Sequence, residues 1–164
     1  MWLLALGLGA AAVALWPEVP DRIPLHFGPD GTPDRWGERS VLGWFGLPLV
    51  VLAMAAGAEG LLSWTLARPE APYLNLPSKE AILALPPERR APVWDRVRSL
   101  IYAVMATCVL AFALIQGGIW VEAHGANGQG WVLAGGLSAL VLPMAAVVWG
   151  IVRVDAEIRR QRER

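Results

Sequence analysis

The sequence predicts an all-α integral membrane protein with four transmembrane helices. An ordered Pro/Gly-rich extracytoplasmic loop is expected after the first helix, and a short amphipathic helical inner loop after the second. Of the 164 residues, 55% are hydrophobic, which is more than a typical soluble domain carries. The charged residues gather between apolar runs that are long enough to cross a bilayer. Residues 1–164 are therefore expected to form a single four-span membrane domain.

The first apolar run covers residues 2–16 and ends at Pro17. It is shorter than the ~20 residues that usually cross a bilayer, so spanning requires local thinning or help from flanking residues. A cleaved signal peptide is the alternative, because Ala12-Val13-Ala14 has the small-x-small form of a cleavage site. We favour a membrane helix, because no basic segment precedes the run.

Three longer apolar runs follow, at about residues 41–67, 99–121 and 131–154. Each reaches the ~20 residues needed for a transmembrane helix. Several tryptophans fall near the ends of these runs, as an aromatic belt at the membrane interface requires: Trp44, Trp64, Trp120, Trp131 and Trp149. Most tryptophans are therefore expected to mark membrane depth and not a binding site.

Basic residues predict the orientation. They are concentrated in the 68–98 connector and in the C-terminal tail, and they are scarce in the 17–40 and 122–130 connectors. The positive-inside rule then places both termini and the 68–98 connector in the cytoplasm. The other two connectors are expected outside.

The inner connector is expected to contain two short helical segments. Ser78 can cap a helix over Lys79–Leu85, and Pro92 can begin a second helix that continues into the third span. Apolar side chains such as Ile82 and Leu85 are expected in the inner headgroup layer, while the arginines meet anionic lipid. Docking to a cytoplasmic partner is the alternative.

The outer loop at residues 17–40 carries an unusual share of the polar chemistry, including one of the two histidines. Four of its prolines, Pro20, Pro24, Pro29 and Pro33, restrict φ and block a helix. Asp30-Gly31 is typical of a tight turn. We therefore expect a fixed structure on the outer face of the membrane. The residues expected to contact a ligand or partner are His26, Phe27, Asp30, Asp34 and Trp36.

Residues 20–40 read PDRIPLHFGPDGTPDRWGERS. This order resembles the signature of the bacterial domain of unknown function 1648 family, roughly P-x-x-I-P-x-H-F followed by G-x-P-D-x-W-G. That domain also stands at the N-terminus of the SdpI-type immunity and signal-receptor membrane proteins. The resemblance implies an SdpI-like membrane module of unknown biochemistry in the bacterial cytoplasmic (inner) membrane. It supplies no catalytic residue.

A metal site is one interpretation of the two histidines. If the outer connectors meet, His26, His124, Glu122 and Asp30 offer imidazole and carboxylate ligands that suit zinc or a similar divalent ion. No metal-binding spacing motif accompanies them, so we expect no cofactor. We favour a structural His26 that is hydrogen-bonded to loop carbonyls. Partner contact and pH sensing remain as further alternatives.

Glu59 is the one acid well inside an apolar run, and at that depth it needs a polar partner. The candidates are Gln116, Ser63, Thr107, Tyr102 and Ser138. Glu59 either belongs to a proton or cation relay, or it is hydrogen-bonded between helices or reaches the inner interface. We favour the second interpretation. Glycine pairs in the spans allow close helix packing, which builds a compact bundle or a homodimer equally well.

Together these features favour a non-enzymatic membrane module that senses or binds a peptide, an envelope component or a partner membrane protein through its outer loop. A small ion-coupled transporter that uses Glu59 is the first alternative. An outward-facing metal-binding protein or metalloenzyme that uses His26 and His124 is the second. The formal net charge of zero gives no sign of a nucleic-acid partner, and the single cysteine excludes an intramolecular disulfide.

Overall fold

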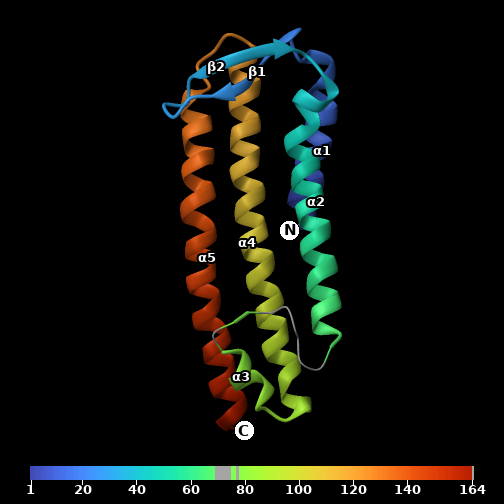
Figure 1. Cartoon of the computed structure of the whole chain (residues 1–164), viewed down its shortest axis with the longest axis vertical. Helices are drawn as coiled ribbons and strands as arrows, with labels where there is room; N and C mark the ends of the chain where they lie inside the picture. Colours follow the sequence, from blue (N-terminus) through green and yellow to red (C-terminus); the bar gives the residue numbers. More distant parts are fainter. Residues whose placement is uncertain (69–74, 77, 164) are drawn as a thin grey trace.

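A computed structural model describes residues 1–68, 75–76 and 78–163, so parts of the 68–98 connector and Arg164 lie outside the described residues. The helices are α1 (Trp2–Leu15), α2 (Val41–Leu66), α3 (Lys79–Leu83), α4 (Pro87–Ala123) and α5 (Gln129–Glu163). A 3-10 turn, η1 (Trp16–Glu18), leads to the strands β1 (Arg22–Phe27) and β2 (Pro33–Glu38). The long helices run side by side, the strands cross one end of them, and α3 lies at the other end (Figure 1). We call these the hairpin end and the arginine-rich end.

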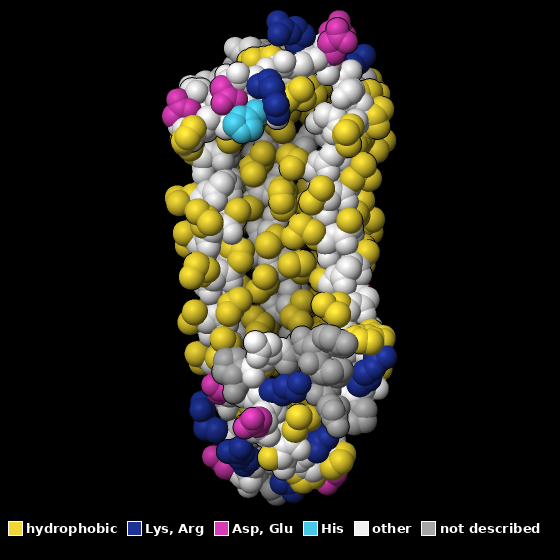
Figure 2. Space-filling view, viewed as in Figure 1, with side chains coloured by type: hydrophobic (Ala, Val, Ile, Leu, Met, Phe, Trp, Pro, Cys, Tyr) yellow, Lys and Arg dark blue, Asp and Glu magenta, His cyan; other side chains and the backbone are white. Residues whose placement is uncertain are grey.

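The helices α2, α4 and α5 are long and apolar enough to cross a membrane. The fourth expected span, α1, has 14 residues and is therefore about 21 Å long, less than the ~30 Å hydrocarbon core. It runs beside only the part of α2 that is nearer to the hairpin (Figure 1). Apolar side chains cover the middle of the molecule, and the charged side chains gather at its two ends (Figure 2). This distribution fits a protein that spans a lipid bilayer.

The expected glycine faces build the packing between α4 and α5. A methyl group added at Gly135 would lie 2.8 Å from the Ala111 carbonyl oxygen, so the two helix backbones approach closely there. A side chain at Gly118 would likewise meet the backbone nitrogen of Val132 at 3.2 Å. Gly57, Gly60 and Gly136 face open space instead. Part of the small-residue surface therefore serves the intramolecular bundle.

The arginine-rich end differs from the expected amphipathic loop. At 37 and 35 residues, α4 and α5 are about 55 and 52 Å long, so they extend beyond the hydrocarbon core. The short helix α3 packs on this extension: Ile82 is 0% exposed and Leu85 is 4% exposed, in a cluster with Val93, Val97, Val154 and Ile158. Placing Ile82 and Leu85 in the headgroup layer was wrong, because these side chains fill a protein core.

One predicted helix start and one predicted cap at this end were also wrong, although α3 begins at Lys79 as expected. The helix α4 begins at Pro87, because a proline in the first turn loses no helical hydrogen bond and fixes a helical φ. It then continues through Pro92, which lies inside the helix and does not start it. The Ser78 hydroxyl does not cap α3; it donates to the Asp155 carboxylate of α5. Arg90 instead satisfies carbonyl oxygens at the end of α3, donating to Leu83 at 2.7 Å and to Leu85 at 2.8 Å. The arginines here hold the protein together as well as carrying charge.

The expected ordered outer loop is a β-hairpin. The strands β1 and β2 pair antiparallel, with Arg22 opposite Glu38 and Phe27 opposite Pro33. Residues between the strands form the expected turn, in which the Gly31 amide donates to the Gly28 carbonyl and Gly31 has a φ of +80°. Pro24 and Pro33 lack an N–H but fit here, because each strand of a two-stranded sheet is an edge strand.

Candidate functional site

The hairpin lies across the helix ends and is fixed at its base by a hydrophobic cluster. Ile23 of β1 is 0% exposed and packs with Ala12 of α1, Trp44 of α2 and Ile119 of α4. Trp44 is itself fully buried, and its indole N–H donates to the Ala12 carbonyl at 2.8 Å. The prediction that Trp44 belongs to an interfacial belt was therefore wrong, because this side chain joins α1, α2 and the hairpin.

Polar contacts reinforce the base of the hairpin. The Arg39 guanidinium donates to the Val19 carbonyl at 2.8 Å and lies 5.0 Å from the centroid of the Trp16 ring. This geometry combines a charge-assisted hydrogen bond with a cation–π contact. Ser40 then caps α2, accepting from the Gly43 amide at 3.0 Å. The chain therefore leaves the hairpin and enters α2 along a fixed path.

The tip of the hairpin is held by α5. The Gln129 side-chain amide donates to the Asp30 carbonyl oxygen at 2.7 Å. A methyl group added at Gly31 would lie 2.7 Å from the Leu133 side chain, so the turn rests directly on α5. The Asp30 carboxylate accepts from the Thr32 hydroxyl at 2.7 Å and from the Thr32 amide at 3.0 Å. These bonds lower the pKa of Asp30, with the hydroxyl contributing most.

His124 ties the second outer connector to η1. Its Nδ1 lies 2.8 Å from the Trp120 carbonyl oxygen and its Nε2 lies 3.2 Å from the Glu18 carbonyl oxygen. A carbonyl oxygen only accepts, so both hydrogen bonds form together only when both ring nitrogens carry hydrogen, as in the imidazolium. The ring also lies 4.1 Å from the Trp120 ring, centroid to centroid.

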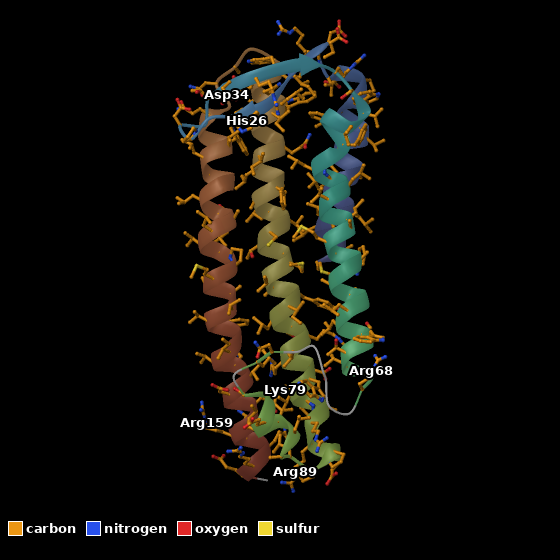
Figure 3. The ribbon with its side chains drawn as sticks, viewed as in Figure 1. His26, Asp34, Arg68, Lys79, Arg89 and Arg159 are labelled. Atoms are coloured by element: carbon orange, nitrogen blue, oxygen red, sulfur yellow. The ribbon has the colours of Figure 1, made fainter. Side chains whose placement is uncertain are left out.

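His26 has a different partner from the one expected. Its Nδ1 lies 2.6 Å from the Asp34 carboxylate, across the hairpin, and both side chains are more than half exposed (Figure 3). The expected hydrogen bonds to loop carbonyls belong to His124 instead. His26 and Asp34 thus form an exposed polar pair on the hairpin.

The four candidate metal ligands are not brought together. His26 pairs with Asp34, Asp30 with Thr32, and Glu122 accepts from the Gly128 amide at 2.9 Å. Among the residues that the structure describes, no group of three or more His, Cys, Asp or Glu side chains could hold a metal ion. The His26–Asp34 pair alone offers two ligands, fewer than a zinc site requires.

The remaining expected contact residues differ in how far they are exposed. Trp36 and the neighbouring Leu25 are 37% and 43% exposed, whereas Phe27 packs against the hydrophobic cluster beneath. Trp36 also borders a hollow of about 380 Å³ that is lined by Pro20, Arg22 and Ala123. The hairpin therefore presents aromatic and charged side chains over an anchored base.

Glu59 has its polar partners on two helices. The Tyr102 hydroxyl of α4 donates to its Oε2 at 2.5 Å, and the Ser63 hydroxyl of α2 donates to its Oε1 at 3.2 Å. Both carboxylate oxygens thus accept a hydrogen bond. Gln116 makes a separate contact, donating to the Trp44 carbonyl at 3.3 Å.

Sequence reasoning missed three anchoring residues: Arg39, Gln129 and Trp16. Arg39 carried a signal, because a positive charge directly before a helix start is unfavourable for the helix dipole and therefore suggests another role. Gln129 carried none, since its contact with Asp30 spans 99 positions of sequence.

These features define a helical protein with membrane-like spans and a β-hairpin fixed across one end of its bundle. Residues 2–52 match the family model described as domain of unknown function (DUF1648), which confirms the resemblance over this segment. The match covers α1, the hairpin and the first part of α2, including Ile23, Trp44 and Arg39. No curated protein and no solved structure matches the chain.

Proposed function

We propose that the chain is a non-enzymatic membrane module that binds an extended peptide segment of a partner on its hairpin, by strand addition along β2. The observation that carries this proposal is the asymmetry of the hairpin. The strand β1 contacts α4 and contains the buried Ile23, whereas none of the residues of β2 is buried. In the described part of the chain the sheet has two strands. The free edge of β2 can therefore accept a third strand.

The side chains around this edge suit a peptide with mixed character. Asp34 and Arg35 are exposed and supply one charge of each sign, while Trp36 offers an apolar contact next to the hollow at Arg22. Main-chain hydrogen bonds would supply affinity, and a peptide side chain placed against Trp36 would supply selectivity. Because the hairpin is anchored before binding, ordering of the hairpin itself costs little conformational entropy when the peptide associates.

The same proposal places the hairpin end outside the cell. The labelled basic residues Arg68, Lys79, Arg89 and Arg159 all lie at the opposite end (Figure 3). The positive-inside rule assigns that end to the cytoplasm. In this arrangement the protein is a multi-pass component of the bacterial cytoplasmic membrane and the end of α5 faces the cytoplasm, whereas α1 begins near the middle of the bundle and does not supply a full fourth crossing (Figure 1).

The test selects peptides from a random library on the protein in lipid nanodiscs and then N-methylates the selected peptides at alternate amides. In an added strand, every second peptide amide faces the β2 edge. Strand addition therefore predicts that methylating one alternating set of amides abolishes binding, whereas methylating the other set leaves binding unchanged. Trp36→Ala should weaken binding, whereas Trp149→Ala, a similarly exposed tryptophan on α5, should not. An equal loss of binding on methylation of either alternating set of amides would contradict strand addition.

A second candidate function is proton or cation transfer through Glu59. It is favoured by the hydrogen bonds that link Glu59 to Ser63 and Tyr102, since a carboxyl group with hydroxyl neighbours can pass a proton. Proton flux into liposomes that is lost in Glu59→Gln and slowed in Tyr102→Phe would support it. Flux that is the same in Glu59→Gln as in the wild type would exclude it.

A further inference from the structure

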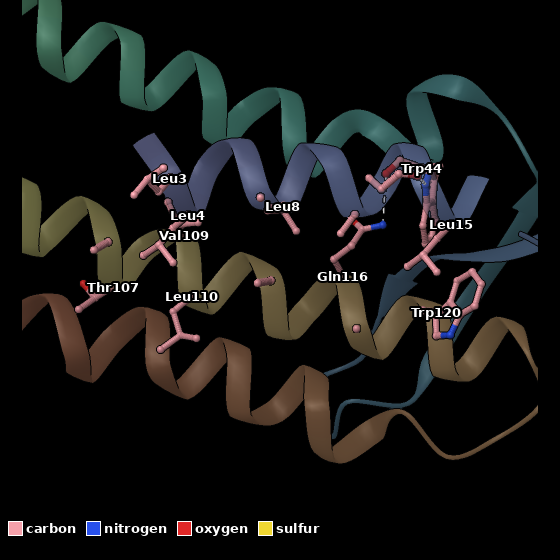
Figure 4. Close-up of a pocket in the computed structure, with 16 residues that line it drawn as sticks. Leu3, Leu4, Leu8, Leu15, Trp44, Thr107, Val109, Leu110, Gln116 and Trp120 are labelled. Atoms are coloured by element: carbon pink, nitrogen blue, oxygen red, sulfur yellow. Dashed lines mark hydrogen bonds between the residues drawn. The ribbon is translucent and has the colours of Figure 1, made fainter. Parts of the chain in front are cut away.

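An apolar groove of about 760 Å³ lies between α1 and α4 and is independent of the hairpin surface (Figure 4). Its lining residues run from Leu3 to Leu15 on α1 and from Ala106 to Trp120 on α4, with Trp44 of α2 at one end. The rim is open to the surroundings of the bundle, because Leu3, Leu4 and Leu110 are 88%, 51% and 48% exposed. This volume falls in the range of sites that hold small molecules.

One buried polar atom in this groove has no partner. Gln116 lines the groove and is 6% exposed; its side-chain nitrogen donates to the Trp44 carbonyl, and its Oε1 accepts no hydrogen bond from any described residue. Two other polar groups of the lining are hydrogen-bonded within the protein: the Thr107 hydroxyl donates to the Val104 carbonyl, and the Trp44 indole N–H donates to the Ala12 carbonyl. An unsatisfied buried acceptor costs about 1–3 kcal/mol, so a bound donor would stabilise it.

The groove has the length and depth of one membrane leaflet. The lining stretch of α1 is about 18 Å long and that of α4 about 21 Å, compared with ~15 Å for half of the hydrocarbon core. It begins beside Trp44 and Trp120 near the hairpin end and runs towards the middle of the bundle (Figure 4). Gln116 lies one helical turn from Trp120, in the part of the groove nearer to the hairpin.

We propose that this groove binds the hydrocarbon chain of a single-chain lipid from the leaflet at the hairpin end, and that the head group donates a hydrogen bond to Gln116 Oε1. The ligand class is an amphiphile with an O–H or N–H next to its chain, such as a monoacylglycerol. The chain lies along the small and aliphatic side chains of α1 and α4. Because Gln116 Oε1 is shielded in the free protein, binding requires the amide to turn towards the donor.

The test uses two probes with the same chain. Monoolein carries hydroxyl donors and methyl oleate carries none. Each competes with a monoolein analogue that bears a photoreactive diazirine in its chain, on the full protein in lipid nanodiscs, and cross-linked peptides are identified by mass spectrometry. We expect labelling on α1 and α4 that monoolein displaces about three- to tenfold more effectively than methyl oleate, the effect of one added hydrogen bond.

Three variants separate the parts of the proposal. Gln116→Leu should remove the advantage of monoolein while methyl oleate still displaces the label, which also shows that the groove has kept its shape. Ala113→Phe fills the groove and should abolish labelling of α1 and α4. Leu140→Phe, at an exposed position of α5 outside the groove, should change neither result.

Two results of the labelling experiment would overturn the proposal. One is labelling that spreads over α5 as strongly as over α4 and persists in Ala113→Phe, which would describe ordinary lipid around the bundle. The other is equal displacement by the two probes in the wild type, which would leave Gln116 without a role in binding. A separate experiment places Ala113→Cys in a Cys108→Ala background without added probe. A disulfide between two copies of this variant would assign the groove to a second copy of the chain and would equally contradict the lipid site.

Discussion

Replacing Ile23 by alanine tests whether the hairpin is anchored as the structure describes. Ile23 is 0% exposed, and its hydrophobic cluster includes Trp44 of α2 and Ile119 of α4. Truncating a buried isoleucine to alanine typically costs about 2–5 kcal/mol. The loss should fall on attachment of the hairpin and not on the α4–α5 pair, because Ile23 makes no part of the clusters nearer to the arginine-rich end.

Amide hydrogen exchange measures this loss directly. At about 1.4 kcal/mol per factor of ten, the expected cost raises the opening equilibrium of the hairpin roughly thirtyfold to several-thousandfold. Exchange of peptides from residues 20–40 should accelerate by that factor in nanodiscs, while peptides from α5 keep the wild-type rate. Mass spectrometry of pepsin fragments resolves both regions in one sample.

Leu25→Ala is the matched control, because Leu25 lies on the same strand but is 43% exposed. We expect an acceleration below roughly tenfold for it, since partly exposed side chains contribute less to stability. Equal effects of Ile23→Ala and Leu25→Ala would refute the anchored hairpin. Faster exchange in α5 as well would show that the hairpin and the bundle unfold as one unit.

Other changes at the hairpin end have separate expected outcomes. Gly31→Ala should loosen the hairpin tip in the same exchange assay more than Gly125→Ala loosens its own turn: both have positive φ, but only Gly31 has Leu133 and Gln129 where the new methyl would lie. Thr32→Val should raise the pKa of Asp30 towards its ordinary value, because the hydrogen bond from the Thr32 hydroxyl, which lowers this pKa most, is lost. NMR titration of the Asp30 carboxyl group measures the change. Since folding lowers this pKa, the bond stabilises the turn above the ordinary Asp pKa and is lost as the pH falls through the folded value. His124→Phe should accelerate exchange at the hairpin base by about tenfold or less, because it removes hydrogen bonds but keeps an aromatic ring beside Trp120.

The sequence predicted the helices better than their ends. Apolar runs identify α2, α4 and α5 because a bilayer-spanning segment must be apolar over its whole width. The ends of α4 and α5 escape this signal, since outside the membrane a helix needs an apolar stripe on one side only. That stripe includes Val93 and Val154, and Ile82 of α3 covers it. Reading Ile82 as lipid-facing ignored this protein surface, part of which, at Val154 of α5, lies 72 positions away in sequence.

The hairpin could be predicted as ordered but not as a β-structure. Prolines within Arg22–Phe27 and Pro33–Glu38 argue against strands in a larger sheet, and that argument fails when every strand is an edge. The roles of the histidines depended on contacts across the fold: His124 reaches Glu18 over 106 positions, whereas His26 meets Asp34 only once the strands pair. Residue type predicted polar contacts for the histidines at this end, but the strand register decides the partner of His26 and the packing of α4 against η1 decides that of His124.

The side of the membrane on which the hairpin lies is the most direct test of the proposed function. Single cysteines at Asp34 of the hairpin and at Arg159 of α5, each in a Cys108→Ala background, are treated in intact cells with a membrane-impermeant maleimide. We expect labelling of Asp34→Cys in intact cells, and labelling of Arg159→Cys only after the membrane is permeabilised. The reverse pattern would place the hairpin in the cytoplasm and contradict a role in binding partners outside the cell.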